Sequence, residues 1–260
     1  MSAIKAFYEY IFVELADHRV NNWPLMSTPL YPTALIILYL YIVYKALPAY
    51  MAKRKAYNLK TVLAIYNMFQ VIACVLLIYG VATSGWITRY SLGCELCDFS
   101  EDKMAVRMAG YVWWTMMLKI IELIETLFFT LRKKYNQVTV LHVYHHASTF
   151  AVAWLAVKFY PGGMLTLNII LNCFIHVLMY TYYFLSSLGP KMQKRLETLK
   201  PKLTAVQLIQ LFVMFIHTLQ ILAPTCKVPK IAAIIHLPNI IINITFFVDF
   251  YKQNYLKKVN

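Results

Sequence analysis

Long runs of apolar residues recur along most of the 260-residue chain, and short polar connections separate them. Each run has the roughly 20 residues that an α-helix, rising about 1.5 Å per residue, needs to cross the hydrocarbon core of a bilayer. The pattern therefore predicts about seven membrane-spanning helices. The predicted spans cover residues 28–48, 62–86, 108–131, 138–158, 163–187, 203–223 and 229–251.

The composition supports a membrane protein, because 60% of the residues are hydrophobic and only 14% are charged. A soluble domain of this length would be far less apolar. The connections between the spans are too short to fold separately. We therefore expect one all-α integral membrane domain over residues 1–260, with any chemistry inside the helical bundle.

The charge is strongly positive, +14 at pH 7. Most of the Lys and Arg residues fall in alternate connections, namely "AKRKAYNLK", "RKKYNQ", "GPKMQKRLETLKPK" and the tail "YKQNYLKKVN". The positive-inside rule makes these segments cytosolic, which places the amino terminus in the lumen and the carboxyl terminus in the cytosol. Orientation and anionic lipid explain this charge better than nucleic acid does, and a cytosolic anionic substrate is the alternative.

Four of the predicted spans carry polar residues at helical spacing, so that each set lies on one face of its helix. With the orientation above, all four sets fall in the cytosolic half of the membrane. The four sets are Lys119, Glu122, Glu125 and Thr126; His142, His145 and His146; His176, Tyr180 and Tyr183; and Thr204, Gln207 and Gln210.

Ionisable side chains inside a membrane are costly and mark functional sites. Four polar faces at one depth predict a shared internal cavity that is open to a cytosolic ligand and apolar towards the lumen. Structural explanations exist for single residues: Lys119 and Glu122 can form an i, i+3 ion pair, and an isolated His217 or His236 can be a hydrogen-bonded core residue. They do not explain three histidines beside a lysine and two glutamates.

The segments "KIIELIET", "HVYHH", "HVLMYTYY" and "TAVQLIQ", in this order and spacing, resemble the signature boxes of the ELO family of very-long-chain fatty-acid elongases. Those boxes are usually written KxxExxDT, HxxHH, HxxMYxYY and TxxQxxQ. "NNWPLMSTPL" and "YNMFQV" also resemble family segments, so the match covers roughly residues 20–255. One departure is Glu125, which stands where the family usually has Asp.

The resemblance implies an acyltransferase that condenses a long-chain acyl-CoA with malonyl-CoA to give a 3-ketoacyl-CoA, CO2 and CoA. It implies seven helices around an acyl tunnel and no cofactor or metal ion. Neutral imidazole is a competent acyl acceptor near pH 7, and we assign His145 as the nucleophile. His142, His146 and His176 would orient groups or transfer protons, although His146 and His176 stay open as acyl acceptors.

The remaining site residues follow from the same resemblance. Glu122 and Glu125 would fix histidine tautomers, Lys119 would pair with those carboxylates, and Tyr180 and Tyr183 would donate to thioester or enolate oxygens. Basic residues after the third span would meet CoA phosphates. The expected substrate-binding residues are Asn67, Gln70, Arg132, Lys133, Lys134, Gln207 and Gln210.

Three cysteines fall in predicted luminal loops, an oxidising side where a bridge can form. "CELC" alone indicates neither redox chemistry nor zinc, because no second ligand pair accompanies it. Family members with cysteines at matching positions imply that Cys94 pairs with Cys226 and that Cys97 stays free. Cys74 and Cys173 lie within predicted spans, where a buried thiol is expected.

Lys257 and Lys258 form a di-lysine in the tail 252–260 and resemble a retrieval signal of endoplasmic-reticulum membrane proteins. We therefore expect a multi-pass protein of that membrane. The expected partners are the two CoA substrates, membrane lipid, a second copy in a homodimer, and other enzymes of the elongation cycle.

Two other functions fit parts of the pattern. A membrane di-iron desaturase or hydroxylase also has HxxHH boxes, but its two iron ions take about eight histidines, and this chain has seven, of which His18, His217 and His236 lie outside the boxes. A seven-span lipid transporter or receptor would explain a cavity. It would not explain the concentration of His, Glu and Lys at one depth.

Overall fold

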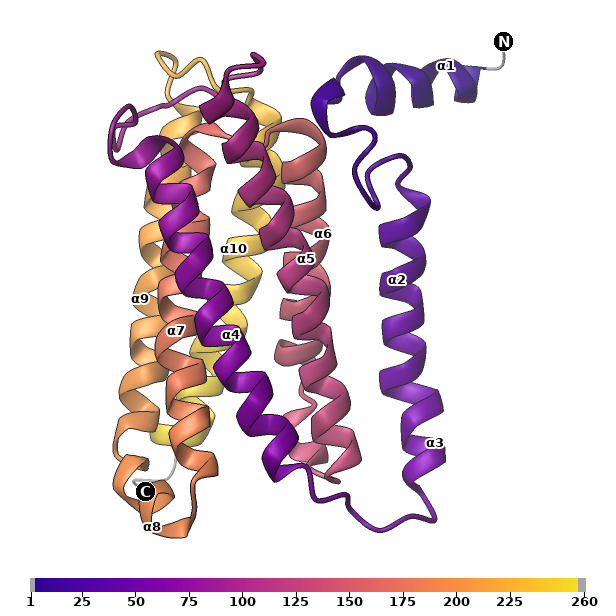
Figure 1. The fold of residues 1–260 in the computed structure, drawn as a ribbon, viewed down its shortest axis with the longest axis vertical. Helices are drawn as coiled ribbons and strands as arrows, with labels where there is room; N and C mark the ends of the chain where they lie inside the picture. Colours follow the sequence, from indigo (N-terminus) through magenta and orange to yellow (C-terminus); the bar gives the residue numbers. More distant parts are fainter. Residues whose placement is uncertain (1–2, 257–260) are drawn as a thin grey trace. The chain divides into compact units, whose positions relative to one another are not determined.

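The computed structural model describes residues 3–256, and all regular secondary structure within that range is helical. A helix occupies each of the seven predicted spans (Figure 1). The all-α prediction is therefore confirmed. The predicted retrieval signal at Lys257 and Lys258 lies outside the described residues.

Five helices among the described residues are long and apolar enough to cross a membrane, which confirms a multi-pass membrane protein. The helices at the other two segments, α5 (Lys103–Leu131) and α6 (Val140–Phe159), carry the Lys, Glu and His residues of the predicted site, and these lower their hydropathy. The number of seven spans and the orientation of the termini stay predictions. The five apolar helices are Leu30–Met51, Lys60–Trp86, Gly163–Ser187, Leu199–Leu222 and Lys230–Leu256.

The chain forms two compact units, each built from two separate stretches of sequence. The first contains the residues up to Ala56 together with Leu96–Met164. The second contains Tyr57–Glu95 together with the residues from Leu165 onward. The expectation of one domain over 1–260 stays a prediction.

The first unit contains the amino-terminal helices and the α5–α6 pair. α5 begins five residues before the predicted span, because the side chain of Asp102 accepts a hydrogen bond from Met104 N at 3.0 Å and caps the helix. Thr139 caps α6 in the same way, accepting from His142 N at 3.1 Å. The other helices of the first unit are α1 (Ala3–Glu9), η1 (Tyr10–Glu14), η2 (His18–Val20), α2 (Leu30–Tyr41), η3 (Ile42–Ala46), α3 (Leu47–Met51) and η5 (Tyr135–Gln137).

An apolar cluster packs α2 and η3 against the α5–α6 pair. Its buried members are Tyr39, Val43, Leu123 and Val143, from four different helices. Leu40, Leu127, Val138 and Ala147 surround them. The register of α2 relative to the two polar helices is therefore fixed by packing.

The loop before α2 is held on the end of α6 by a buried lysine. Lys158, 1% exposed, donates to Asn21 Oδ1 at 2.7 Å and to Met26 O at 3.0 Å. Asp17 N donates to Lys158 O at 2.8 Å. A buried ammonium needs such acceptors, so these contacts fix the loop.

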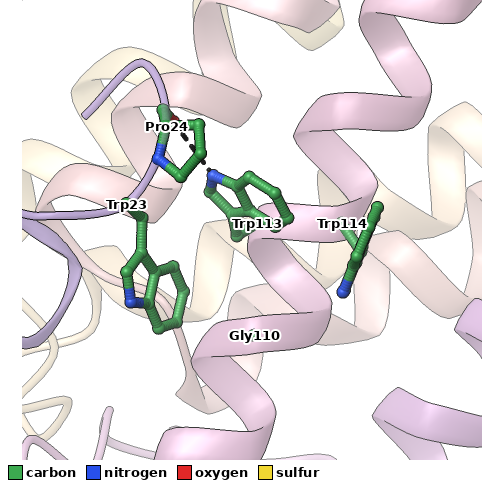
Figure 2. Close-up of a pocket in the computed structure, with 5 residues that line it drawn as sticks. All are labelled: Trp23, Pro24, Gly110, Trp113 and Trp114. Atoms are coloured by element: carbon green, nitrogen blue, oxygen red, sulfur yellow. Dashed lines mark hydrogen bonds between the residues drawn. The ribbon is translucent and has the colours of Figure 1, made fainter.

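The same loop borders a pocket lined by three tryptophans. Figure 2 shows the residues that line it: Trp23 and Pro24 come from the loop, and Gly110, Trp113 and Trp114 come from α5. The indole Nε1 of Trp113 donates to Pro24 O at 3.1 Å. The lining has no titratable side chain, so the pocket offers contact area rather than acid–base chemistry.

The second unit is a bundle in which α4 packs on α7, α7 on α9, and α9 on α10. A disulfide joins Cys94, after α4, to Cys226, before α10. Trp86 Nε1 donates to Thr166 Oγ1 at 2.9 Å. The unit's helices are α4 (Lys60–Val81), η4 (Ala82–Trp86), α7 (Leu167–Ser187), α8 (Pro190–Leu196), α9 (Leu199–Leu219), η7 (Gln220–Leu222), α10 (Lys230–Tyr251) and η8 (Lys252–Leu256), and η6 (Gly163–Thr166) spans the boundary between the units.

Candidate functional site

The predicted α5 stripe begins with a buried ion pair. Lys119 Nζ lies 3.0 Å from Oε1 and 2.9 Å from Oε2 of Glu122. Lys119 is 6% exposed and Glu122 is fully buried. The i, i+3 pair that the sequence allowed is therefore present, and it keeps two charges inside the first unit at a net charge of zero.

Glu125, the next carboxylate of the stripe, reaches across to α6. Its Oε2 lies 3.6 Å from His146 Nε2, and both side chains are buried. That separation suits an ion pair when the imidazole is protonated. The longer arm of Glu, in place of the family's usual Asp, ends beside a histidine.

His142 contacts the last residue of the stripe. Its Nε2 lies 3.0 Å from Thr126 Oγ1, and Thr126 Oγ1 lies 2.8 Å from the hydroxyl of Tyr39 on α2. Thr126 is fully buried and Tyr39 is 5% exposed. Three helices therefore contribute to one chain of hydrogen bonds.

The three histidines of α6 lie next to one another in the order expected from their spacing. The ring centroids of His142 and His146, one turn apart, are 4.3 Å from each other. His145 lies beside His146 at 5.7 Å. His142 contacts Thr126 and His146 contacts Glu125, and His145 precedes His146 on the same helix.

The basic residues expected to meet CoA phosphates lie in the connection between α5 and α6. Arg132 and Lys133 are half-buried and Lys134 is exposed. The first histidine of α6 follows this connection, so both features lie at the same end of the helix pair. Such a position suits an anionic group near the histidines.

In the second unit, His176 of α7 lies in an aromatic cluster. Its ring centroid is 5.6 Å from that of Tyr180, which lies 6.0 Å from Tyr66 of α4. Gln70 Nε2 donates to the Tyr66 hydroxyl at 2.9 Å. Of the predicted residues, Gln70 and Tyr180 are fully buried, whereas Tyr183 is 37% exposed.

Two thiols border the same cluster. The thiol of Cys74 lies close enough to interact with the thiol of Cys173 and the ring of His176. Cys74 and Cys173 are free, buried cysteines, as expected for thiols within spans. Tyr66, Cys74 and Cys173 are absent from the site that the sequence predicted.

The other predicted substrate-binding residues of the second unit are spread over two helices. Asn67 lies on α4 and is buried. On α9, Gln207 donates to Met179 Sδ at 3.5 Å, and Gln210 donates to Met214 Sδ. The shared cavity that would unite all four polar faces stays a prediction.

The loop cysteines have the arrangement that the resemblance implied, with Cys94 bonded to Cys226 and Cys97 free. Burial raises the pKa of the Cys97 thiol to about 12. Cys97 N also donates to the Tyr160 hydroxyl at 2.8 Å. The thiol is therefore protonated and structural near neutral pH.

Glu125, His142 and His146 could also hold a metal ion, because their possible ligand atoms lie within 4.8 Å of one another. The same trio suits proton transfer, since a carboxylate beside an imidazole stabilises its protonated form. A chelation experiment separates these uses.

Tyr39 is the residue of the first unit's cluster that sequence reasoning missed. It lies in an apolar helix with other tyrosines nearby, and no polar residue repeats at helical spacing around it. Thr126 was recognised on the α5 face, but its contact with α2 has no sequence signal.

Comparison with known proteins identifies the family of this chain. The family model described as ELO, GNS1/SUR4 family, matches residues 24–260. The chain is 43% identical over 215 residues to very long chain fatty acid elongase 7 of Rattus norvegicus, covering 83% of this chain and 76% of that protein. It is 37% identical over 260 residues to very long chain fatty acid elongase 1 of Mus musculus, covering 99% of this chain and 92% of that protein.

An insect relative gives the same result. The chain is 36% identical over 256 residues to very long chain fatty acid elongase AAEL008004 of Aedes aegypti, covering 98% of this chain and 71% of that protein. The four polar boxes lie inside the region that the family model matches. The chain belongs to the ELO, or GNS1/SUR4, family.

Proposed function

We propose that this fatty-acid elongase catalyses the condensing step, in which a long-chain acyl-CoA and malonyl-CoA give a 3-ketoacyl-CoA, CO2 and CoA. Membership of the ELO family and the names of the elongase relatives support the reaction class. The observation that carries the proposal is a cluster within one helix pair: Glu125, Thr126 and His146 are buried, His142 is half-buried, and His145 lies beside His146.

In the first half-reaction, a neutral ring nitrogen of His145 attacks the thioester carbon of the acyl-CoA. The carbon–sulfur bond breaks, the imidazole loses its other ring proton, and the CoA thiolate takes up a proton and leaves as CoA. The product is an acyl-imidazole, which is reactive enough to pass its acyl group on. Arg132 and Lys133 would hold the CoA phosphates during this step.

In the second half-reaction, malonyl-CoA loses CO2, and the electron pair of the broken carbon–carbon bond forms an enolate. The enolate carbon attacks the acyl-imidazole, the carbon–nitrogen bond breaks, and the imidazole regains a proton. Donors that stabilise the developing negative charge accelerate such steps. The protonated form of His146, stabilised by Glu125, is the donor proposed within the first unit. Tyr180 and Tyr183 stay donors that only the family resemblance predicts.

The direct test incubates the purified protein with a ladder of acyl-CoAs and carboxyl-labelled or C2-labelled malonyl-CoA. We expect C2 label in a 3-ketoacyl-CoA and release of the carboxyl label as CO2. Metal chelators should leave the rate unchanged. Loss of activity with chelators, restored by an added metal ion, would instead support a metal-dependent role for the histidines.

We further propose that the protein resides in the endoplasmic-reticulum membrane. The predicted di-lysine signal supports this location, and the test is the distribution of the Lys257→Ser, Lys258→Ser double variant in cells. Escape of that variant from the reticulum is expected, and full retention would show that the two lysines are dispensable. Dimer formation and contacts with other elongation-cycle enzymes stay predictions.

A further inference from the structure

Tyr39 lies outside the four sequence boxes, yet it is joined through Thr126 to a histidine side chain of α6 in the first unit. Its hydroxyl contacts Thr126 Oγ1 at 2.8 Å, and Thr126 Oγ1 contacts His142 Nε2 at 3.0 Å. The three residues come from α2, α5 and α6. The connection therefore joins the amino-terminal span to the histidine box.

Packing holds this connection in place. The ring of Tyr39 belongs to the apolar cluster with Val43, Leu123 and Val143. The hydroxyls of Tyr39 and Thr126 lie where water has little access, since the two residues are 5% and 0% exposed. A buried hydroxyl needs a partner, so the contact is costly to break.

The direction of the hydrogen bonds follows from the donors available. Thr126 has a single hydroxyl proton and contacts two partners, so it can donate to only one of them. A phenol is a stronger donor and a weaker acceptor than an aliphatic alcohol, which favours donation from Tyr39 to Thr126. Thr126 then donates to His142 Nε2, and neutral His142 carries its proton on Nδ1.

We propose that Tyr39 is a positioning residue of the elongase, which fixes the tautomer of His142 through Thr126. The proposal rests on the condensing function given above and adds a residue to it. Tyr39 acts through Thr126 rather than on the substrate. The ring centroid of His142 lies 4.3 Å from that of His146. The tautomer of His142 therefore decides which of its two ring nitrogens carries a proton next to the other histidine.

The first test is a double-mutant cycle on kcat with KM measured in parallel. Tyr39→Phe removes one hydroxyl and keeps the packed ring. It should lower kcat about three- to tenfold, the effect of losing one hydrogen bond, while KM for acyl-CoA stays unchanged. Thr126→Val should lower kcat at least as much, and Thr126→Ser should retain most of the activity.

The decisive variant is Tyr39→Phe combined with Thr126→Val. If Tyr39 acts through Thr126, the double variant should be no slower than Thr126→Val alone. Losses that multiply, or a Tyr39→Phe enzyme with wild-type kcat, would overturn the proposal. Tyr41→Phe is the matched control, because Tyr41 is on the same helix and 59% exposed; its kcat should not change.

The second test reads the tautomer directly by ¹⁵N NMR of histidine-labelled protein, with the His142 signal assigned from a His142→Gln sample. We expect protonation at Nδ1 in the wild type and a mixed or reversed signal in Tyr39→Phe. An unchanged signal would contradict the proposal, even if Thr126→Val fails to fold. A wild type without condensing activity would refute the proposed function alone, since the tautomer experiment does not depend on turnover.

Discussion

Oε2 of Glu125 lies 3.6 Å from Nε2 of His146, between the two helices that carry the charged residues of the site. Both side chains are buried, so the carboxylate is poorly screened from the imidazole. A histidine that gains a proton during the reaction is stabilised by such a neighbour. The relationship gives Glu125 a role that depends on charge.

Replacing Glu125 by Gln should therefore slow the reaction without unfolding the protein. A hydrogen bond or contact to a charged group contributes about 1.5–3 kcal/mol, so kcat should fall roughly 10- to 100-fold. Glu125→Asp, which restores the family's usual residue, should keep most of the activity. Glu197→Gln, at an exposed position, is the control. A Glu125→Gln enzyme with wild-type kcat would show that this carboxylate has no part in turnover.

Variants of the Lys119–Glu122 pair can show whether the pair serves stability, activity or both. Lys119→Met leaves Glu122 buried without its cation and should lower the free energy of unfolding by about 3–5 kcal/mol. Adding Glu122→Leu removes the unpaired charge and should restore most of that loss. Thermal unfolding in detergent measures both effects. We expect the restored double variant to be inactive, and full activity in it would mean that the pair is structural only.

The Cys94–Cys226 disulfide closes a long loop, with 132 residues of sequence separation. In the chain-entropy model a bridge of this span stabilises by about 5 kcal/mol. Cys94→Ser should therefore lower the unfolding temperature strongly. Reducing agent should lower the unfolding temperature of the wild type to the same value. Peptide mapping under non-reducing conditions should recover the Cys94–Cys226 peptide, and alkylation of both cysteines in native protein would contradict the bridge.

Cys97 should behave as an inert thiol. Because burial raises its pKa to about 12, native protein at pH 8 contains very little thiolate and should resist iodoacetamide until it unfolds. The folded state holds the proton more tightly than the unfolded chain. Its contribution to stability is therefore complete below about pH 9 and is lost as the pH rises towards 12. Mass spectrometry after timed alkylation tests this, and fast native labelling at pH 8 would refute it.

Much of the helical organisation could be predicted from the sequence. Apolar run length located the spans, and the 3.6-residue period placed Glu125 and Thr126 on one face. The start of α5 at Lys103 was missed because its cap, Asp102, and the following polar turn lie outside the apolar run. The interleaving of two compact units depends on long-range packing, which has no local signal.

The candidate site, too, could be predicted from the sequence only in part. His142 and His146 were recognisable because their spacing places both on one face of a helix. Tyr39 was not, because Tyr41 and Tyr44 look alike in sequence yet are 59% and 51% exposed. Only the packing of α2 against Leu123 and Val143 distinguishes the tyrosine that contacts Thr126.

In the proposed mechanism, His145 carries the acyl group between the two half-reactions. The most direct measurement is intact-protein mass spectrometry after treatment with acyl-CoA alone, under conditions that preserve acyl-imidazoles. We predict a mass gain of one acyl group, a matching burst of CoA no larger than the amount of enzyme, and an adduct on α6 that His145→Ala abolishes. Active enzyme that shows neither the mass gain nor the burst would contradict the covalent route and leave direct attack of the enolate on bound acyl-CoA.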